Sequence, residues 1–175
     1  MDELLVLVNG LPGAGKTTLG AALARSLDAW FLSKDAIKEA LASSLGNHSA
    51  PSELGGIAMD TIWSLAKASP TAVVIDSWWF KPRDLNFARS GIEHTGARHT
   101  VEIWCDVPAS MAKARYTSRQ RSPIYQDHHH LTRDWDDWAA RATPLGLTPI
   151  LRVDTTQPVD LADLARQIRT VAGAG

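Results

Sequence analysis

Short apolar runs recur along the chain and are separated by longer segments with a different spacing. The first run, residues 4–8, contains five consecutive apolar residues and ends at Asn9-Gly10. An unbroken run of this length is typical of a strand that is buried on both faces of a parallel sheet. Four similar runs follow and complete the set of predicted strands: residues 30–32, 72–75, 101–105 and 150–153.

The segments between these runs repeat apolar residues every three or four positions, as amphipathic helices do. Leu19, Leu23 and Leu27, for example, share one helical face. Residues 46–56 and 122–130 lack this pattern, and we interpret the first as a mobile loop and the second as part of a lid. Strands that alternate with helices indicate a parallel α/β fold in one domain over residues 1–175. The predicted helices are residues 17–27, 35–45, 57–68, 83–96, 108–121, 131–142 and 159–171.

The composition agrees with a single globular domain and excludes several classes of protein. The 175 residues are 45% hydrophobic and carry a net charge of −1, which argues against tight nonspecific binding to long nucleic acid. The single cysteine, Cys105, excludes an internal disulfide and a cysteine-based metal centre. The N-terminus has no basic region, and no apolar run approaches the roughly 20 residues of a membrane span. We therefore expect a cytoplasmic protein without a membrane partner.

Residues 10–17 match the phosphate-binding loop pattern GxxxxGK[ST] at every fixed position. Its glycines allow successive backbone N–H groups to face phosphate oxygens, and the following helix adds its positive end. Lys16 adds a charge at the β- and γ-phosphates, and the Thr17 hydroxyl is a ligand for Mg²⁺. The preceding strand and the following helix are the context that this motif requires. The predicted nucleoside triphosphate site comprises Gly10, Leu11, Pro12, Gly13, Ala14, Gly15, Lys16, Thr17 and Thr18.

Beyond this loop, the chain resembles the polynucleotide-kinase-like group of small P-loop kinases, which includes the AAA_33 and zeta-toxin-like proteins. The resemblance implies a three-layer α/β/α sandwich with a five-stranded parallel sheet in the order 2-3-1-4-5 and a lid at about residues 119–130. It also implies an ATP-dependent kinase. Five blocks carry it in the expected order: residues 10–18, 32–38 and 73–77, then 106–108 followed by Arg115 and Arg119, and 153–156.

The resemblance assigns roles to residues around the second strand and in the lid. Asp35 corresponds to the base that accepts the proton of the attacking hydroxyl, although an aspartate here is also a good helix N-cap. Lys38 stands where the family has an arginine that contacts the acceptor; the alternative is a solvated lysine paired with Asp35. Arg119 corresponds to the lid arginine, with Arg121 as a substitute. Arg115 and the turn at Thr155 correspond to the nucleotide side.

Two further groups are candidates for metal and acceptor binding. Asp76 follows the third predicted strand and could hold Mg²⁺ or the acceptor, or serve only as a turn residue. Trp78 and Trp79 follow directly and could form a stacking wall for a ring-shaped acceptor, or pack under the next helix. We interpret residues 128–130, three consecutive histidines, as a solvated part of the lid rather than a metal site. Residues 134–138 form a charged and aromatic helix face that could close over an acceptor, and we interpret them as mostly structural.

The predicted reaction is transfer of the γ-phosphate of Mg·ATP to a hydroxyl group. The near-neutral charge and the lysine at position 38 favour a small acceptor, such as a nucleoside, a sugar or an antibiotic. The 5′-hydroxyl end of a nucleic acid is the alternative acceptor. A nucleotide-binding switch, or an NTPase without an acceptor, is the alternative outside the kinases.

Overall fold

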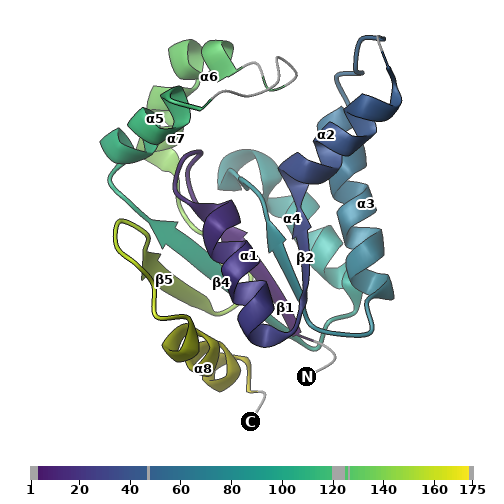
Figure 1. Cartoon of the computed structure of the whole chain (residues 1–175), viewed down its shortest axis with the longest axis vertical. Helices are drawn as coiled ribbons and strands as arrows, with labels where there is room; N and C mark the ends of the chain where they lie inside the picture. Colours follow the sequence, from purple (N-terminus) through teal and green to yellow (C-terminus); the bar gives the residue numbers. More distant parts are fainter. Residues whose placement is uncertain (1–3, 47, 120–124, 126, 174–175) are drawn as a thin grey trace.

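Five parallel strands form the central sheet of the computed structural model, which describes residues 4–46, 48–119, 125 and 127–173. Their order is β2-β3-β1-β4-β5, which confirms the predicted order (Figure 1). The register pairs Val8 with Asp76, and Ser33 with the same aspartate. The start of the phosphate loop, Asp76 and the end of β2 therefore meet at one edge of the sheet. The strands are β1 (Leu4–Asn9), β2 (Trp30–Ser33), β3 (Val73–Asp76), β4 (His99–Asp106) and β5 (Ile150–Asp154).

The two faces of the sheet are buried in two separate apolar cores. Alternate side chains of β1 point to opposite faces, as a strand requires: Val6 and Val8 join one core, and Leu5 and Leu7 join the other. Helices α1 (Lys16–Leu27) and α8 (Leu161–Ala172) cover the first face. Helices α3 (Leu54–Ala68) and α4 (Lys81–Thr95) cover the second. This arrangement confirms the predicted three-layer α/β fold.

The remaining helices lie beyond the ends of the strands. Figure 1 shows α2 (Lys34–Ser44) on one side of the phosphate loop and the group α5 (Ala109–Thr117), α6 (Asp127–Arg133) and α7 (Trp135–Arg141) on the other. Among the described residues, no helix is both long and apolar enough to cross a bilayer.

Several predicted boundaries differ from the structure. Helix α3 begins three residues before the predicted position, inside the segment expected to be a loop. The predicted helix over residues 131–142 begins earlier, at Asp127, and is divided into α6 and α7 at Asp134. The backbone of Asp134 nevertheless bonds to both helices, because its N–H donates to His130 and its carbonyl accepts from Trp138. Helix α5 ends at Thr117, and Arg121 lies outside the described residues.

Candidate active site

The phosphate loop connects β1 to α1 and contains backbone that only glycine adopts readily. Gly13 and Gly15 each have a φ of 86°, in the left-handed region. A Cβ atom on Gly13 would lie 2.1 Å from the carbonyl oxygen of Ala112 in α5. Gly13, at a variable position of the motif, is therefore needed for the close approach of α5 as well as for the conformation of the loop.

Lys16, the first residue of α1, is held by the loop itself. Its ammonium donates to the carbonyl oxygens of Gly10 at 2.8 Å and Leu11 at 2.9 Å. Burial lowers the pKa of Lys16 to about 8, and the carboxylates of Asp76 and Asp35 oppose part of that effect. The loop thus places a partly desolvated cation where the motif requires one for phosphate.

Asp76 lies at the end of β3 beside the phosphate loop and is only 4% exposed. Its Oδ2 accepts a short hydrogen bond from the Thr17 hydroxyl, and its Oδ1 has no hydrogen-bond partner among the described residues. Burial raises the pKa of Asp76, and the hydrogen bond from Thr17 opposes the rise. A hydroxyl beside a buried carboxylate with an unsatisfied oxygen fits the oxygen ligands that Mg²⁺ prefers. Thr17 and Asp76 could therefore hold this ion.

One cavity of about 170 Å³ brings together eight of the predicted residues. It lies at the carboxyl ends of the strands, where open parallel sheets bind their ligands. Residues from α2, from the segment after β3 and from helices α5, α6 and α7 all reach it. The predicted residues in its lining are Pro12, Lys16, Thr17, Asp35, Lys38, Asp76, Trp78 and Arg119.

Asp35 occupies the second position of α2 and is half-buried at this cavity. The N-cap of the helix is Ser33, so the alternative interpretation of Asp35 as the N-cap is wrong. Tyr125 fixes this turn from the lid side, because its hydroxyl donates to the backbone oxygen of Asp35 at 3.0 Å and to Glu39 Oε1 at 2.9 Å. The Lys38 ammonium lies 4.9 Å from the centre of the Tyr125 ring. Lys38 is thus packed against an aromatic ring rather than simply solvated.

The two tryptophans after Asp76 lie in different environments. Trp78 is half-buried, lines the cavity and contacts Trp138 with 6.0 Å between ring centres. Trp79 is 2% exposed and stacks on Trp63 in the core beneath α3 and α4. Consecutive side chains in extended backbone point to opposite faces. The structure therefore corrects the expectation that Trp79 contacts an acceptor and leaves Trp78 at the cavity.

The sequence did not single out several residues of the lining, among them Lys34, Arg83 and Tyr116, whereas Trp138 belongs to the segment 134–138 that could close over an acceptor. His130, which we expected to be solvated, is half-buried at the cavity and lies against Trp138. Its Nδ1 is 2.6 Å from the carboxylate of Asp134, one helical turn further on. The position of Lys34 directly before the predicted base Asp35 could have indicated that Lys34 lies at the cavity. No residue near Arg83 in the sequence indicated that Arg83 lines it.

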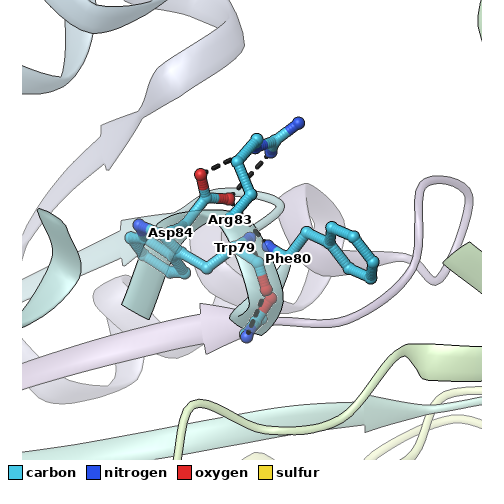
Figure 2. A network of polar contacts seen from close by, with 5 residues as sticks. Trp79, Phe80, Arg83 and Asp84 are labelled. Carbon is cyan, nitrogen blue, oxygen red and sulfur yellow. Dashed lines mark hydrogen bonds and ion pairs between the residues drawn. The ribbon is translucent and has the colours of Figure 1, made fainter. Parts of the chain in front are cut away.

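Arg83 is fixed at the cavity by a neighbouring carboxylate at the start of α4. Its Nε and Nη2 donate to Asp84 at 2.7 and 2.8 Å, and Asp84 also accepts from the backbone N–H of Phe80 (Figure 2). Asp84 therefore satisfies a free N–H at the helix start, as in a capping box, and also orients the guanidinium. The pKa of Arg83 is raised by this hydrogen bond.

A network of buried polar groups around Asn9 holds the start of the phosphate loop in place. The Asn9 side-chain oxygen accepts from the backbone N–H groups of Gly10 at 2.8 Å and Trp79 at 3.1 Å. Its amide donates to Glu102, which also accepts from the N–H groups of Leu145 and Gly146. The first residue of the phosphate loop is thereby joined to the segment that carries Trp78.

A second cavity, of about 440 Å³, adjoins the outer side of the phosphate loop. Arg115 and Thr155, predicted on the nucleotide side, line it together with Gly15 and Thr18. The Thr155 hydroxyl donates to the Ala14 carbonyl at 2.7 Å, and Arg115 donates to the Thr155 carbonyl at 3.4 Å. Arg119 lines both cavities, so this side chain lies between the two compartments.

Comparisons with known proteins place the chain in a family. A model of the AAA domain family AAA_33 matches residues 5–145. No curated protein matches the chain. A candidate kinase from Chloroflexus aurantiacus has a similar structure, with a TM-score of 0.72 and 24% identity over 98% of this chain and 99% of that one. A gluconokinase from Sinorhizobium meliloti (TM-score 0.61, 18% identity, 99% and 93% covered) is also similar. A shikimate kinase from Bacteroides thetaiotaomicron is similar too, with a TM-score of 0.61 and 20% identity over 95% of this chain and 97% of that one.

Proposed function

The chain belongs to this AAA_33 family of P-loop domains, and from that premise we propose that it is a kinase for a small hydroxylated molecule. Lys16 and the loop amides bind the triphosphate of ATP. The adenine of the nucleotide lies on the side of Arg115 and Thr155. Thr17 and Asp76 would hold Mg²⁺, which supplies charge neutralisation at the β- and γ-phosphates when bound. Arg119 approaches the transferred group from between the two cavities.

One observation carries the proposal: Asp35 and the phosphate-binding residues Lys16 and Thr17 line the same cavity. A phosphate bound by the loop and a hydroxyl at Asp35 would therefore share that space. Phosphoryl transfer depends mostly on positioning and on electrostatic stabilisation. Asp35 would orient the hydroxyl and accept its proton at a carboxylate oxygen.

The enclosure of the cavity favours a small acceptor over a polymer. Tyr125, His130 and Trp138 line it from the lid side, and Tyr125 is hydrogen-bonded to α2 across it. The neighbouring atoms Ser77 Oγ and Trp78 Nε1 are buried without a hydrogen-bond partner among the described residues. Buried polar atoms of this kind need partners, and a ligand with several hydroxyl groups would provide them. Two structural neighbours are named as kinases of small molecules, which supports the same reading.

The test is transfer of labelled phosphate from ATP to panels of sugars, sugar acids, nucleosides, antibiotics and oligonucleotides. In the Asp35→Asn variant we expect transfer to fall about 100-fold or more, because the amide cannot accept the proton. Ser33 remains the N-cap, so stability should change by no more than about 1 kcal/mol. Asp60→Asn, at an exposed position of α3, is the matched control. ATP hydrolysis that no hydroxyl compound alters would contradict the kinase, and a preference for oligonucleotide ends would replace the small acceptor.

A further inference from the structure

The acceptor end of the cavity carries more positive charge than the proposed reaction uses. Lys34, Lys38 and Arg83 line it in addition to the residues assigned to the nucleotide. With Asp76 assigned to the metal, Asp35 is the carboxylate of the described lining that remains to face these three cations. The lining therefore holds more cations than carboxylates, although Asp84, which pairs with Arg83 just outside it, offsets one of them and the net charge of the chain is −1.

Several features of its position disfavour the protonated, positively charged form of Lys34. It is the first residue of α2, so its ammonium is near the positive end of the helix dipole. It is half-buried, and burial followed by the nearby Arg83 lowers its pKa. Within the described ranges, no ion pair or hydrogen bond of this ammonium is found. A bound anion would relieve all of these effects together.

Lys16 offers an internal comparison. It is also the first residue of a helix, and burial is also the main cause of its lowered pKa. In the phosphate-loop motif, the reason for such a cation is the phosphate that it binds. The same combination at Lys34, in the same cavity, indicates a second anion.

Arg83 completes a binding pair with Lys34. Asp84 holds two of its nitrogens, Nε and Nη2, and thereby fixes the plane of the guanidinium (Figure 2). Asp84 offsets part of the charge, but Nη1 has no hydrogen-bond partner among the described residues. A preorganised guanidinium edge beside a lysine suits the oxygens of a carboxylate or a phosphate.

We infer that Lys34 and Arg83 bind an anionic group of the acceptor, either a carboxylate or a phosphate. The inference rests on the proposed function, because it takes the acceptor hydroxyl to lie at Asp35. Since Lys34 and Asp35 line the same small cavity, the anion and the reacting hydroxyl belong to one small molecule. The acceptor is a hydroxy acid or a phosphorylated hydroxy compound, and the aromatic wall of Trp78 and Trp138 covers its remaining surface.

The first experiment compares matched pairs of acceptors that differ in charge. Glycerate is paired with glycerol, an aldonate with its alditol, and ribose 5-phosphate with ribose, so that carboxylate and phosphate are tested separately. We expect the anionic member of at least one pair to be phosphorylated with the higher kcat/KM. Lys34→Gln should raise KM for that anion roughly 10- to 100-fold, as loss of a charge-assisted hydrogen bond does. Lys34→Arg should restore much of the affinity, and Lys67→Gln, at an exposed position of α3, should have no effect.

The outcomes separate this inference from the kinase proposal. Preferential phosphorylation of the neutral members, or an equal effect of Lys34→Gln on both members, would overturn the anion site and leave the kinase standing. If no compound is phosphorylated, the kinase proposal fails, and a binding measurement decides the anion site. The phosphate loop is then saturated with Mg²⁺ and a nonhydrolysable ATP analogue, and malonate or inorganic phosphate is titrated by calorimetry. Binding that Lys34→Gln weakens and Lys67→Gln does not supports the site; absence of binding refutes it.

Discussion

The lowered pKa of Lys16 leads to a quantitative prediction about nucleotide binding. The free protein holds this ammonium with a pKa of about 8, because the loop buries it. A bound triphosphate would surround it with negative charge and favour the protonated form. Binding of Mg·ATP should therefore take up a proton at alkaline pH. If the pKa in the complex is 10 or above, the dissociation constant should rise about twofold from pH 7 to 8 and about tenfold from pH 7 to 9.

The stability of the nucleotide-free protein should change in the opposite direction. The ordinary pKa of lysine, 10.5, lies above the folded value, so the unfolded chain binds more protons between about pH 8 and 10.5. The stability contributed by this group is therefore lowest below pH 8 and rises with pH through that window. The difference between the two pKa values corresponds to at most about 3 kcal/mol, and the partial exposure of Lys16 reduces it further.

Isothermal titration calorimetry in buffers with different heats of ionisation measures both the affinity and the proton uptake. Lys16→Met should bind more weakly but without this pH dependence, since no ammonium remains to titrate. Lys34→Gln should keep the dependence, which excludes the second lysine with a lowered pKa as its source. Affinity that stays constant from pH 7 to 9, with no proton taken up, would refute the assignment of Lys16 as a desolvated cation.

Three further predictions test how the site is built. Gly13→Ala should destabilise the protein by about 2 kcal/mol or more in denaturant titrations, because its Cβ would meet the Ala112 carbonyl. The control Gly46→Ala, at positive φ with open space around it, should cost about 1 kcal/mol. Equal losses of stability in the two variants would contradict the close packing of α5. Trp78→Ala should raise KM for the acceptor with little change in melting temperature. Trp79→Ala should cost about 3–5 kcal/mol of stability, because its side chain is buried in the core. If Trp78→Ala instead lost the stability and Trp79→Ala raised KM, the assignment of Trp78 to the acceptor and Trp79 to the core would be refuted. Glu102→Gln should cost about 1–3 kcal/mol by chemical denaturation, because the amide cannot accept all the hydrogen bonds that the carboxylate accepts, and an unchanged midpoint would exclude the network as a support.

The fold could be predicted because its signals are local and repeated. Each buried strand is an apolar run, and most helices between strands have their own periodicity. Apart from the division of the predicted helix over residues 131–142 into α6 and α7, the errors were therefore shifts of element boundaries. Helix α3 began early because Leu54 and Ala58 continue its buried face across Gly55 and Gly56, which resemble a loop in the sequence. The phosphate loop was equally accessible, because its chemistry is contained in eight consecutive residues.

The acceptor side was harder to predict because it is assembled from distant segments. Which of Trp78 and Trp79 reaches the cavity depends on the direction in which the chain leaves β3, and Asn9 fixes that direction from 70 residues away. Arg83 reaches the same space only because Asp84 holds it against the start of α4. The contact of Asn9 leaves no pattern in neighbouring residues, and the adjacent Arg83 and Asp84 do not by themselves show that the guanidinium faces the cavity.

The net charge of the chain does not describe the charge at the proposed acceptor site. A charge of −1 is the sum over the whole surface, and in the sequence it favoured a small acceptor over a nucleic acid. A bound ligand instead responds to the groups within a few ångströms, where screening by water is weakest. At the proposed acceptor site those groups are Lys34, Lys38 and Arg83, with the carboxylates of Asp35 and Asp84 beside them. The proposed anion site therefore does not require a positive net charge, because selection of a small anion depends on the groups around it. A long nucleic acid would instead require an extended basic surface.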